Sequence, residues 1–246
     1  MRRALSLLAL LVAIAISALC VRLGLWQLSR WHEKRAQVTE SAARMSAPVR
    51  ELTGSHALDP SLSGAPVRAT GTFEDSCHVL LAGRIELGEP GVGLLSVLAL
   101  RDGGRLLVDR GWLPALDARD ADIRPFLTSG EQSVFGILEP IETNDRRFEW
   151  LALEGDGPKR WSVGRLAAHG VHEHLGRSLA LYRLVELPGA GAPALPKRTS
   201  PVPPDAGMHL SYAFQWFLFA AGTLGAGVFI TFRERSNSEV TVPRAS

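Results

Sequence analysis

A histidine stands at the start of the last apolar run of the chain, in the stretch "MHLSYAFQWF" at residues 208–217. On a helix, residues three and four apart share one face, and this face would carry His209, Tyr212, Ala213, Trp216 and Ala220. A ring nitrogen at the membrane interface with aromatic surface behind it suits a flat, apolar, metal-centred ligand, with His209 as an axial ligand. The pattern also fits an interfacial aromatic belt that packs on another helix, and the residues alone leave both interpretations open.

Two residues near the other end of the chain are expected at a similar depth, Arg22 and Trp26. The Arg22 side chain either extends into the lipid headgroups or pairs with an anionic group there, such as a haem propionate or a lipid phosphate. Its position favours the headgroups. Trp26, with Trp31, is typical of the aromatic belt at a membrane surface.

The central part of the chain has two further groups of candidates. His169, His172 and His174 lie within six residues, and such a cluster could bind a transition metal. On a helix, His174 would lie on a different face from the other two, which favours a solvated surface patch. In "VDRGWLP" (108–114), Arg110 could meet an anionic ligand, although an ion pair and a packed Trp112 at a strand end are the simpler interpretation.

Motifs of known enzyme classes are missing from the sequence. It has no GxSxG, no Walker loop and no HExxH, and the glycine-rich "GEPGVG" (88–93) reads as a turn between strands. The two cysteines, Cys20 and Cys77, form no CxxC motif and lie in parts of the chain that a disulfide would not join. The net charge of +2 is too balanced for a nucleic-acid binder. We therefore expect a protein that is not an enzyme.

Two uncharged apolar runs, at residues 4–21 and 210–232, predict transmembrane helices, because each is long enough for a hydrocarbon core roughly 30 Å thick. A cleaved signal peptide is the alternative for the first run, but its apolar stretch is longer than usual. Arg2, Arg3, Arg233 and Arg235 flank the outer ends of the runs and indicate that both termini are cytoplasmic. Small residues of the first helix, Ala9, Ala13 and Ser17, are expected to meet Gly222, Gly225 and Ala226 of the second.

The middle of the chain is predicted to form mainly strands. The stretch "DGG" (102–104) is typical of a hairpin turn, and one short helix is expected within 162–176. The predicted strands are 66–74, 77–85, 92–100, 105–113, 132–139 and 178–187. They indicate an α+β fold: an antiparallel-β-rich domain, or a partly closed barrel, between the two transmembrane helices. The expected division is a first transmembrane helix at 1–26, an extracytoplasmic domain with an N-terminal helical arm at 27–187, a Pro- and Gly-rich linker at 188–208, a second transmembrane helix at 209–232 and a cytoplasmic tail at 233–246.

Four stretches, "LGLWQLSRWHEKRA", "GTFE", "GGRLLVDRGWLP" and "HLSYAFQWF", occur in the order and at the places typical of the Surfeit locus protein 1 family, which the chain resembles over essentially its whole length. Members of this family are assembly factors for haem–copper cytochrome oxidases. The resemblance implies a role at the step where haem a enters the catalytic subunit. It implies cytochrome c oxidase subunit I, other assembly factors and membrane lipid as partners.

On the same resemblance, His209 corresponds to the proposed ligand of the haem iron, with Tyr212, Trp216, Arg22 and Trp26 around it. Arg110 and Trp112 match the family's RGW strand, in a structural or partner-facing role. The expected location is the bacterial inner membrane, with the central domain in the periplasm. A cofactor-free scaffold that stabilises an oxidase assembly intermediate is the alternative, and in it His209 is only an interfacial hydrogen-bonding residue.

Overall fold

A computed structural model describes residues 2–52, 59–143, 147–155, 157–190, 192–200 and 207–239 of the chain. The chain forms two compact units. One is made of residues 1–40 and 203–246, and it contains the two long terminal helices. The other is made of residues 41–202, and it contains the strands.

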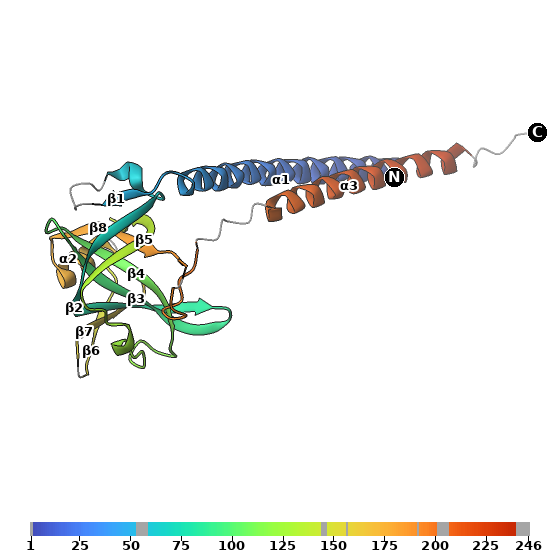
Figure 1. The fold of residues 1–246 in the computed structure, drawn as a ribbon. Helices are drawn as coiled ribbons and strands as arrows, with labels where there is room; N and C mark the ends of the chain where they lie inside the picture. Colours follow the sequence, from blue (N-terminus) through green and yellow to red (C-terminus); the bar gives the residue numbers. More distant parts are fainter. Residues whose placement is uncertain are drawn as a thin grey trace, which may run out of the picture. The chain divides into compact units, whose positions relative to one another are not determined.

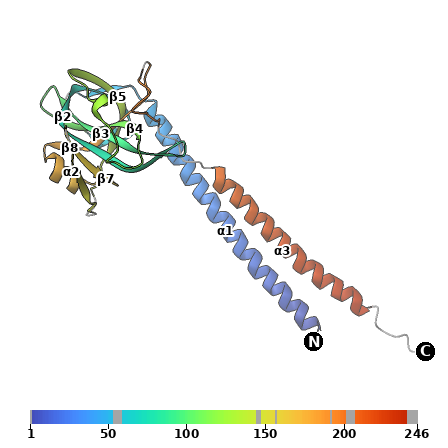
Figure 2. The same ribbon diagram turned by 90° about the horizontal axis from the view of Figure 1, so that it is seen from below.

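The first unit is a pair of helices that lie side by side, α1 (Arg2–Met45) and α3 (Gly207–Glu239) (Figures 1 and 2). By length and composition, both are long and apolar enough to cross a membrane, which is consistent with a membrane protein. Helix α1 runs without a break through the predicted helical arm as far as Met45. It carries neither Pro nor Gly between Leu25 and Met45 to end it.

Small side chains form the seam between the two helices. The buried or half-buried residues of α1 on this face include Ala13, Ser17, Cys20, Gly24 and Gln27, at alternating spacings of four and three. This spacing keeps one face towards a neighbouring helix. The Ser17 hydroxyl donates to the Ala220 carbonyl at 2.9 Å, a bond available only where the backbones come close.

Gly227, and not Gly222 or Gly225, is the glycine of α3 in the seam. A Cβ at Gly227 would lie 2.6 Å from the Ala13 Cβ, whereas one at Gly222 or Gly225 would meet nothing within 4 Å. The predicted contact of Gly222 and Gly225 with α1 is therefore wrong, because the phase of α3 turns them away from the seam. Ala13 and Ser17 do lie in the seam.

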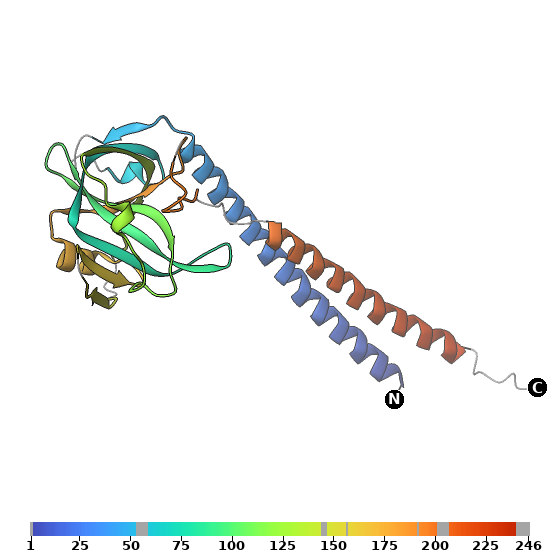
Figure 3. The ribbon, with the colours of Figure 1, turned by 60° about the horizontal axis from the view of Figure 1, so that its bottom comes forward.

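The second unit is built on one mixed sheet whose strands curve round a common core (Figure 3). Its strands are β1 (Arg50–Leu52), β2 (Pro66–Glu86), β3 (Glu89–Leu100), β4 (Arg105–Pro114), β5 (Glu131–Pro140), β6 (Trp150–Leu153), β7 (Lys159–Val163) and β8 (Leu179–Glu186). Their order is β3-β4-β8-β5-β2-β7-β6, and β3 also pairs with β2, so that five strands close into a ring. Helix α2 (Ala168–Leu175) and the short 3-10 turns Pro60–Leu62 and Arg124–Phe126 complete the unit. The α+β fold class predicted from the sequence is confirmed.

Strand β2 is one long strand where the sequence indicates two. Its pairing with β3 continues across two register shifts, between Phe73 and His78 and between Leu81 and Arg84. A bulge of this kind bends a strand without ending it, and this bend lets β2 pair with β5 along its first half and with β7 along its second. Strands β1, β6 and β7 were not predicted.

Two local predictions in this unit have different outcomes. The "DGG" hairpin is confirmed: Gly103 has a φ of +87°, and the Asp102 carboxylate accepts from the Gly104 N–H at 3.1 Å. The predicted short helix begins only at Ala168, because Val163 is the last residue of β7 and pairs with β2.

Candidate functional site

His209 lies in the first turn of α3 and is held by a residue of α1. Its Nδ1 lies 2.8 Å from the Oε1 atom of Gln27. A side-chain amide oxygen only accepts hydrogen bonds, so this arrangement, in which Oε1 of Gln27 faces the ring, requires an imidazole that donates from Nδ1. The other ring nitrogen, Nε2, has no hydrogen-bond partner among the residues that the structure describes.

A neutral imidazole in this state has the form that a metal takes as a ligand, with one nitrogen anchored by a hydrogen bond and the other free to coordinate. Haem iron takes its axial histidine in this way. The residues present at the start of α3 therefore fit the haem group that the sequence resemblance implies.

The predicted stripe on α3 lies mostly in the helix seam. Ala213 and Ala220 are 1% and 7% exposed, and Trp216 is half-buried. Tyr212 lies at the edge of the stripe and is exposed. The stripe thus serves first to pack α3 on α1, and it is most exposed at Tyr212, near its outer end.

Arg22 and Trp26 are not brought to His209 by the helix pairing. Both side chains are exposed, and they lie on the face of α1 that points away from the seam of Cys20, Gly24 and Gln27. The Arg30 guanidinium lies 5.9 Å from the centre of the Trp26 ring, as in an interfacial belt.

An apolar groove lies beside His209 on the helix pair. It measures about 570 Å³ and is lined by Leu28, Leu210, Ser211, Ala213, Phe214 and Phe217. Leu210 follows His209 directly, and Ala213 lies one helical turn beyond it. A groove of this size and lining is within the range of small-molecule sites.

Gln27 is the site residue that the sequence analysis missed. It continues the seam series of α1, where the other members are small or apolar. An amide at such a position needs a polar partner on the facing helix, since burying it unpaired costs free energy. The spacing of four and three that leads to Gln27 is present in the sequence, but only the structure shows that this face of α1 meets α3.

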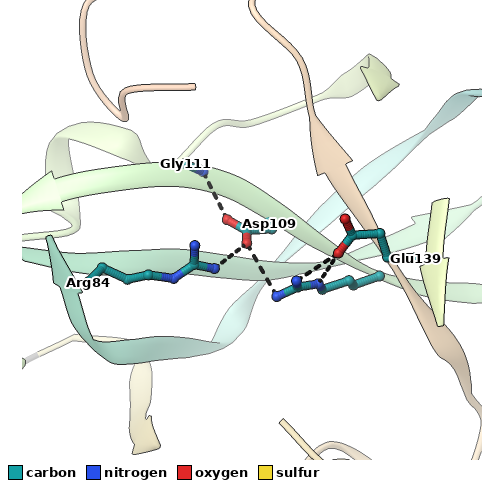
Figure 4. A network of polar contacts seen from close by, with 5 residues as sticks. Arg84, Asp109, Gly111 and Glu139 are labelled. Atoms are coloured by element: carbon teal, nitrogen blue, oxygen red, sulfur yellow. Dashed lines mark hydrogen bonds and ion pairs between the residues drawn. The ribbon is translucent and has the colours of Figure 1, made fainter. Parts of the chain in front are cut away.

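The Asp109 carboxylate of the RGW strand is buried and joins four strands of the ring (Figure 4). It lies 3.1 Å from Arg84 on β2 and 3.7 Å from Arg183 on β8, and Arg183 in turn pairs with Glu139 of β5 at 2.7 Å. The Gly111 N–H also donates to the Asp109 carboxylate, at 3.3 Å. This network ties β2, β5 and β8 to β4, which is a structural role.

Arg110 points to the other side of the same strand and is buried. Its Nη1 donates to the Phe126 carbonyl at 2.6 Å, and the guanidinium lies 4.5 Å from the centre of the Phe73 ring. Burial lowers the pKa of Arg110, with Glu186 acting in the opposite direction. The ion pair expected at "VDRGWLP" is therefore made by Asp109, while Arg110 is held by a carbonyl and an aromatic face.

Of the three histidines of α2, His169 and His172 line one pocket with Glu173, while the contacts of His174 lie elsewhere. His169 lies 3.2 Å from the Glu173 carboxylate, and the His174 ring lies 4.9 Å from that of Trp150 and 4.3 Å from that of Trp161. The described residues contain no group of three or more His, Cys, Asp or Glu side chains that could hold a metal ion. Cys20, in the helix seam, and Cys77 are both free thiols.

The fold defines a class of protein in which two long apolar helices of the membrane-spanning type flank one α+β domain in the sequence. At the start of the second helix, His209 is hydrogen-bonded to Gln27 of the first. The model of the SURF1 family matches residues 14–221, and the chain belongs to this family. The match includes the seam of α1 from Ser17 onwards, the whole second unit and His209.

Among curated proteins, the chain is similar to a SURF1-like protein of Rickettsia felis, with 30% identity over 155 residues. The aligned region covers 58% of this chain and 66% of the relative's length.

Proposed function

We propose that this protein is an assembly factor for a haem–copper cytochrome oxidase and acts where haem a enters the catalytic subunit. Membership of the SURF1 family over residues 14–221 supports the oxidase assembly role. Subunit I of the oxidase, other assembly factors and membrane lipid are the partners that this role requires. The protein would hold or hand over the cofactor and catalyse no reaction of its own.

The observation that carries the haem role is the hydrogen bond from His209 Nδ1 to Gln27 Oε1, since it leaves Nε2 as the coordinating nitrogen. Haem a, when bound, supplies an iron that accepts this nitrogen. Leu28, Leu210, Phe214 and Phe217 of the adjacent groove would cover apolar surface of the ligand and exclude water from it. The seam holds the two helices, and with them His209, in place.

The proposed location is the bacterial inner membrane. Both termini would be cytoplasmic and the strand-rich unit periplasmic, by the positive-inside rule. Cysteine labelling tests this topology: a single cysteine placed at Asp102, in the exposed β3–β4 hairpin, should react with a membrane-impermeant maleimide added to spheroplasts. Labelling only after lysis would contradict the periplasmic assignment.

The optical spectrum of the protein tests haem binding. The protein would be purified in detergent from cells that make haem a, and a Soret band is expected in the wild type. His209→Ala should lose or shift this band, whereas His169→Ala, in the second unit, should keep it. A Soret band that is unchanged in His209→Ala would rule out the ligand role of His209.

The second candidate function is a cofactor-free scaffold for an oxidase assembly intermediate. One observation favours it: Ala213 and Ala220 of the expected ligand stripe are buried, and the Ala220 carbonyl accepts a hydrogen bond from Ser17 of α1, so this part of the stripe is used for helix packing. In this case the purified protein carries no haem, yet it co-purifies with the oxidase catalytic subunit equally well with and without His209→Ala.

A further inference from the structure

We propose that Gln27 is a positioning residue for His209. It holds the imidazole in the Nδ1–H form and so makes Nε2 the nitrogen that faces the haem iron. This inference rests on the proposed haem role of His209, but the hydrogen-bond step is open to a test that needs no haem.

The contact joins residues far apart in the chain, and packing on both sides holds it in place. Gly24, three residues before Gln27, lies against Phe217, and a Cβ at Gly24 would come within 2.7 Å of that ring. Ala213, one turn after His209, is buried in the same seam. Gln27 and His209 are both half-buried, and 2.8 Å separates their polar atoms. The pair is therefore set by the register of the two helices, and not by a chance contact of two mobile side chains.

The chemistry follows from the acceptor. An imidazole with its hydrogen on Nε2 would set the Nδ1 lone pair against the Gln27 oxygen and would occupy the coordinating nitrogen with a proton. Donation from Nδ1 removes both difficulties and makes Nε2 a stronger ligand, as partners behind metal-bound histidines commonly do. Since the Gln27 amide is neutral, it orients the ring without adding a charge at the apolar helix surface.

The first part of the test determines which nitrogen of the His209 ring carries the hydrogen. The protein would be labelled with ¹⁵N-histidine, in detergent and without haem, and the His209 signals among the seven histidines would be assigned from the His209→Ala variant. The wild type should show the Nδ1–H form, and Gln27→Leu should lose this preference. Gln37→Leu is the matched control, because it makes the same change at an exposed position of α1.

The second arm measures haem binding. Gln27→Leu should bind haem about 10–100-fold more weakly than the wild type, with an altered Soret position. Gln27→Glu, which keeps an acceptor at the same place, should retain binding and lower the reduction potential of the iron, because its carboxylate gives the imidazole more negative charge. Gln37→Leu should match the wild type. Equal thermal unfolding of the Gln27 variants would show that loss of the helix pair is not the cause.

The outcomes separate the two hypotheses. An Nε2–H ring in the wild type, which would mean that the Gln27 amide donates, or a ring unchanged by Gln27→Leu, would overturn the positioning role. Haem affinity and spectrum unchanged in Gln27→Leu would overturn it as well. A wild type that binds no haem while its ring still responds to Gln27→Leu would overturn the haem function and leave the orientation of His209 by Gln27 in place.

Discussion

His78 is a titratable side chain enclosed in the second unit, where it is 1% exposed. Its Nδ1 shares a hydrogen bond with the Ser96 hydroxyl at 2.9 Å, and its Nε2 is buried with no partner among the described residues. Burial lowers the pKa of His78; the nearby Arg110 also lowers it, while Asp75 opposes the shift. Folding therefore favours the neutral form of this ring.

This shift predicts that the second unit becomes less stable in mild acid. The unfolded chain takes up a proton at His78 near its ordinary pKa of 6.5, while the folded chain resists it. Stability is thus complete above this value and falls as the pH drops below it, by at most about 1.4 kcal/mol per pH unit until the folded pKa is reached. Chemical unfolding of the full chain in detergent, followed by tryptophan fluorescence between pH 8 and pH 5, measures this slope.

His78→Gln should flatten the slope, because it removes the titrating group and keeps hydrogen-bonding capacity towards Ser96. His32→Gln, at an exposed position of α1, is the control and should keep the wild-type slope. Equal pH dependence in the wild type and His78→Gln would show that the acid sensitivity lies elsewhere.

At the candidate site, the sequence could identify His209 but not its surroundings. A histidine at the start of an apolar run can be recognised in the sequence. Gln27 can be identified as its neighbour only when the rotation of α1 relative to α3 is known. The same phase places Arg22 and Trp26 on the far side of α1. Depth in a membrane helix follows from residue number, but the direction of a side chain depends on the partner helix.

The helix seam makes a prediction at the level of whole elements. A Cβ at Gly24 would lie 2.7 Å from the Phe217 ring, while one at Gly222 would meet nothing within 4 Å. Gly24→Leu should force α1 and α3 apart, because close approach of the backbones is what small residues permit. Gly222→Leu, the same change outside the seam, should leave the pair intact.

Cysteine cross-linking measures this effect. In a Cys20→Ser background, a cysteine pair at Ser17 and Ala220, whose side chain and backbone are in contact, should form a disulfide readily in the otherwise unchanged chain. Cross-linking should fall strongly with Gly24→Leu and stay unchanged with Gly222→Leu. Equal cross-linking in both would mean that Gly24 is not a contact of the seam.

The strands show a similar limit of sequence-based prediction. Alternating apolar residues and the "DGG" turn were enough to predict β3, β4, β5 and β8, because each lies between clear turn signals. The sequence predicts a break in β2 at residues 75–76, between the strands 66–74 and 77–85, but these polar residues lie in a bulge and the pairing with β3 continues beyond it. The short strands β6 and β7 have few residues to show a period, and β7 is fixed by parallel pairing with β2, a contact between segments far apart in the sequence.

At the scale of the whole molecule, the segment at residues 197–198 fastens the end of the second unit to strand β4. Lys197 and Trp112 exchange two backbone hydrogen bonds, of 2.9 and 2.7 Å. Lys197 also pairs with Glu86, and Arg198 with Glu186, both at 2.8 Å. Burial raises the pKa of Glu186, and Arg198 counteracts the shift. The glycine of the RGW strand makes this docking possible, because a Cβ at Gly111 would lie 2.6 Å from the Lys197 carbonyl oxygen.

Gly111→Ala should therefore release this segment while the ring of strands stays folded. Gly111 has a φ of +119°, so the substitution adds backbone strain of about 1–3 kcal/mol to the clash with Lys197. Gly157→Ala is the matched control, because its φ is +122° and nothing lies within 4 Å of its Cβ position. Limited trypsin digestion after Lys197 and Arg198 reports the opening, since cleavage follows the population of the open form. Gly111→Ala should speed this cleavage about tenfold or more, a factor that corresponds to about 1.4 kcal/mol, while the control should cleave at the wild-type rate. Equal protection of both variants would show that the RGW glycine does not hold the segment that leads to α3 and His209.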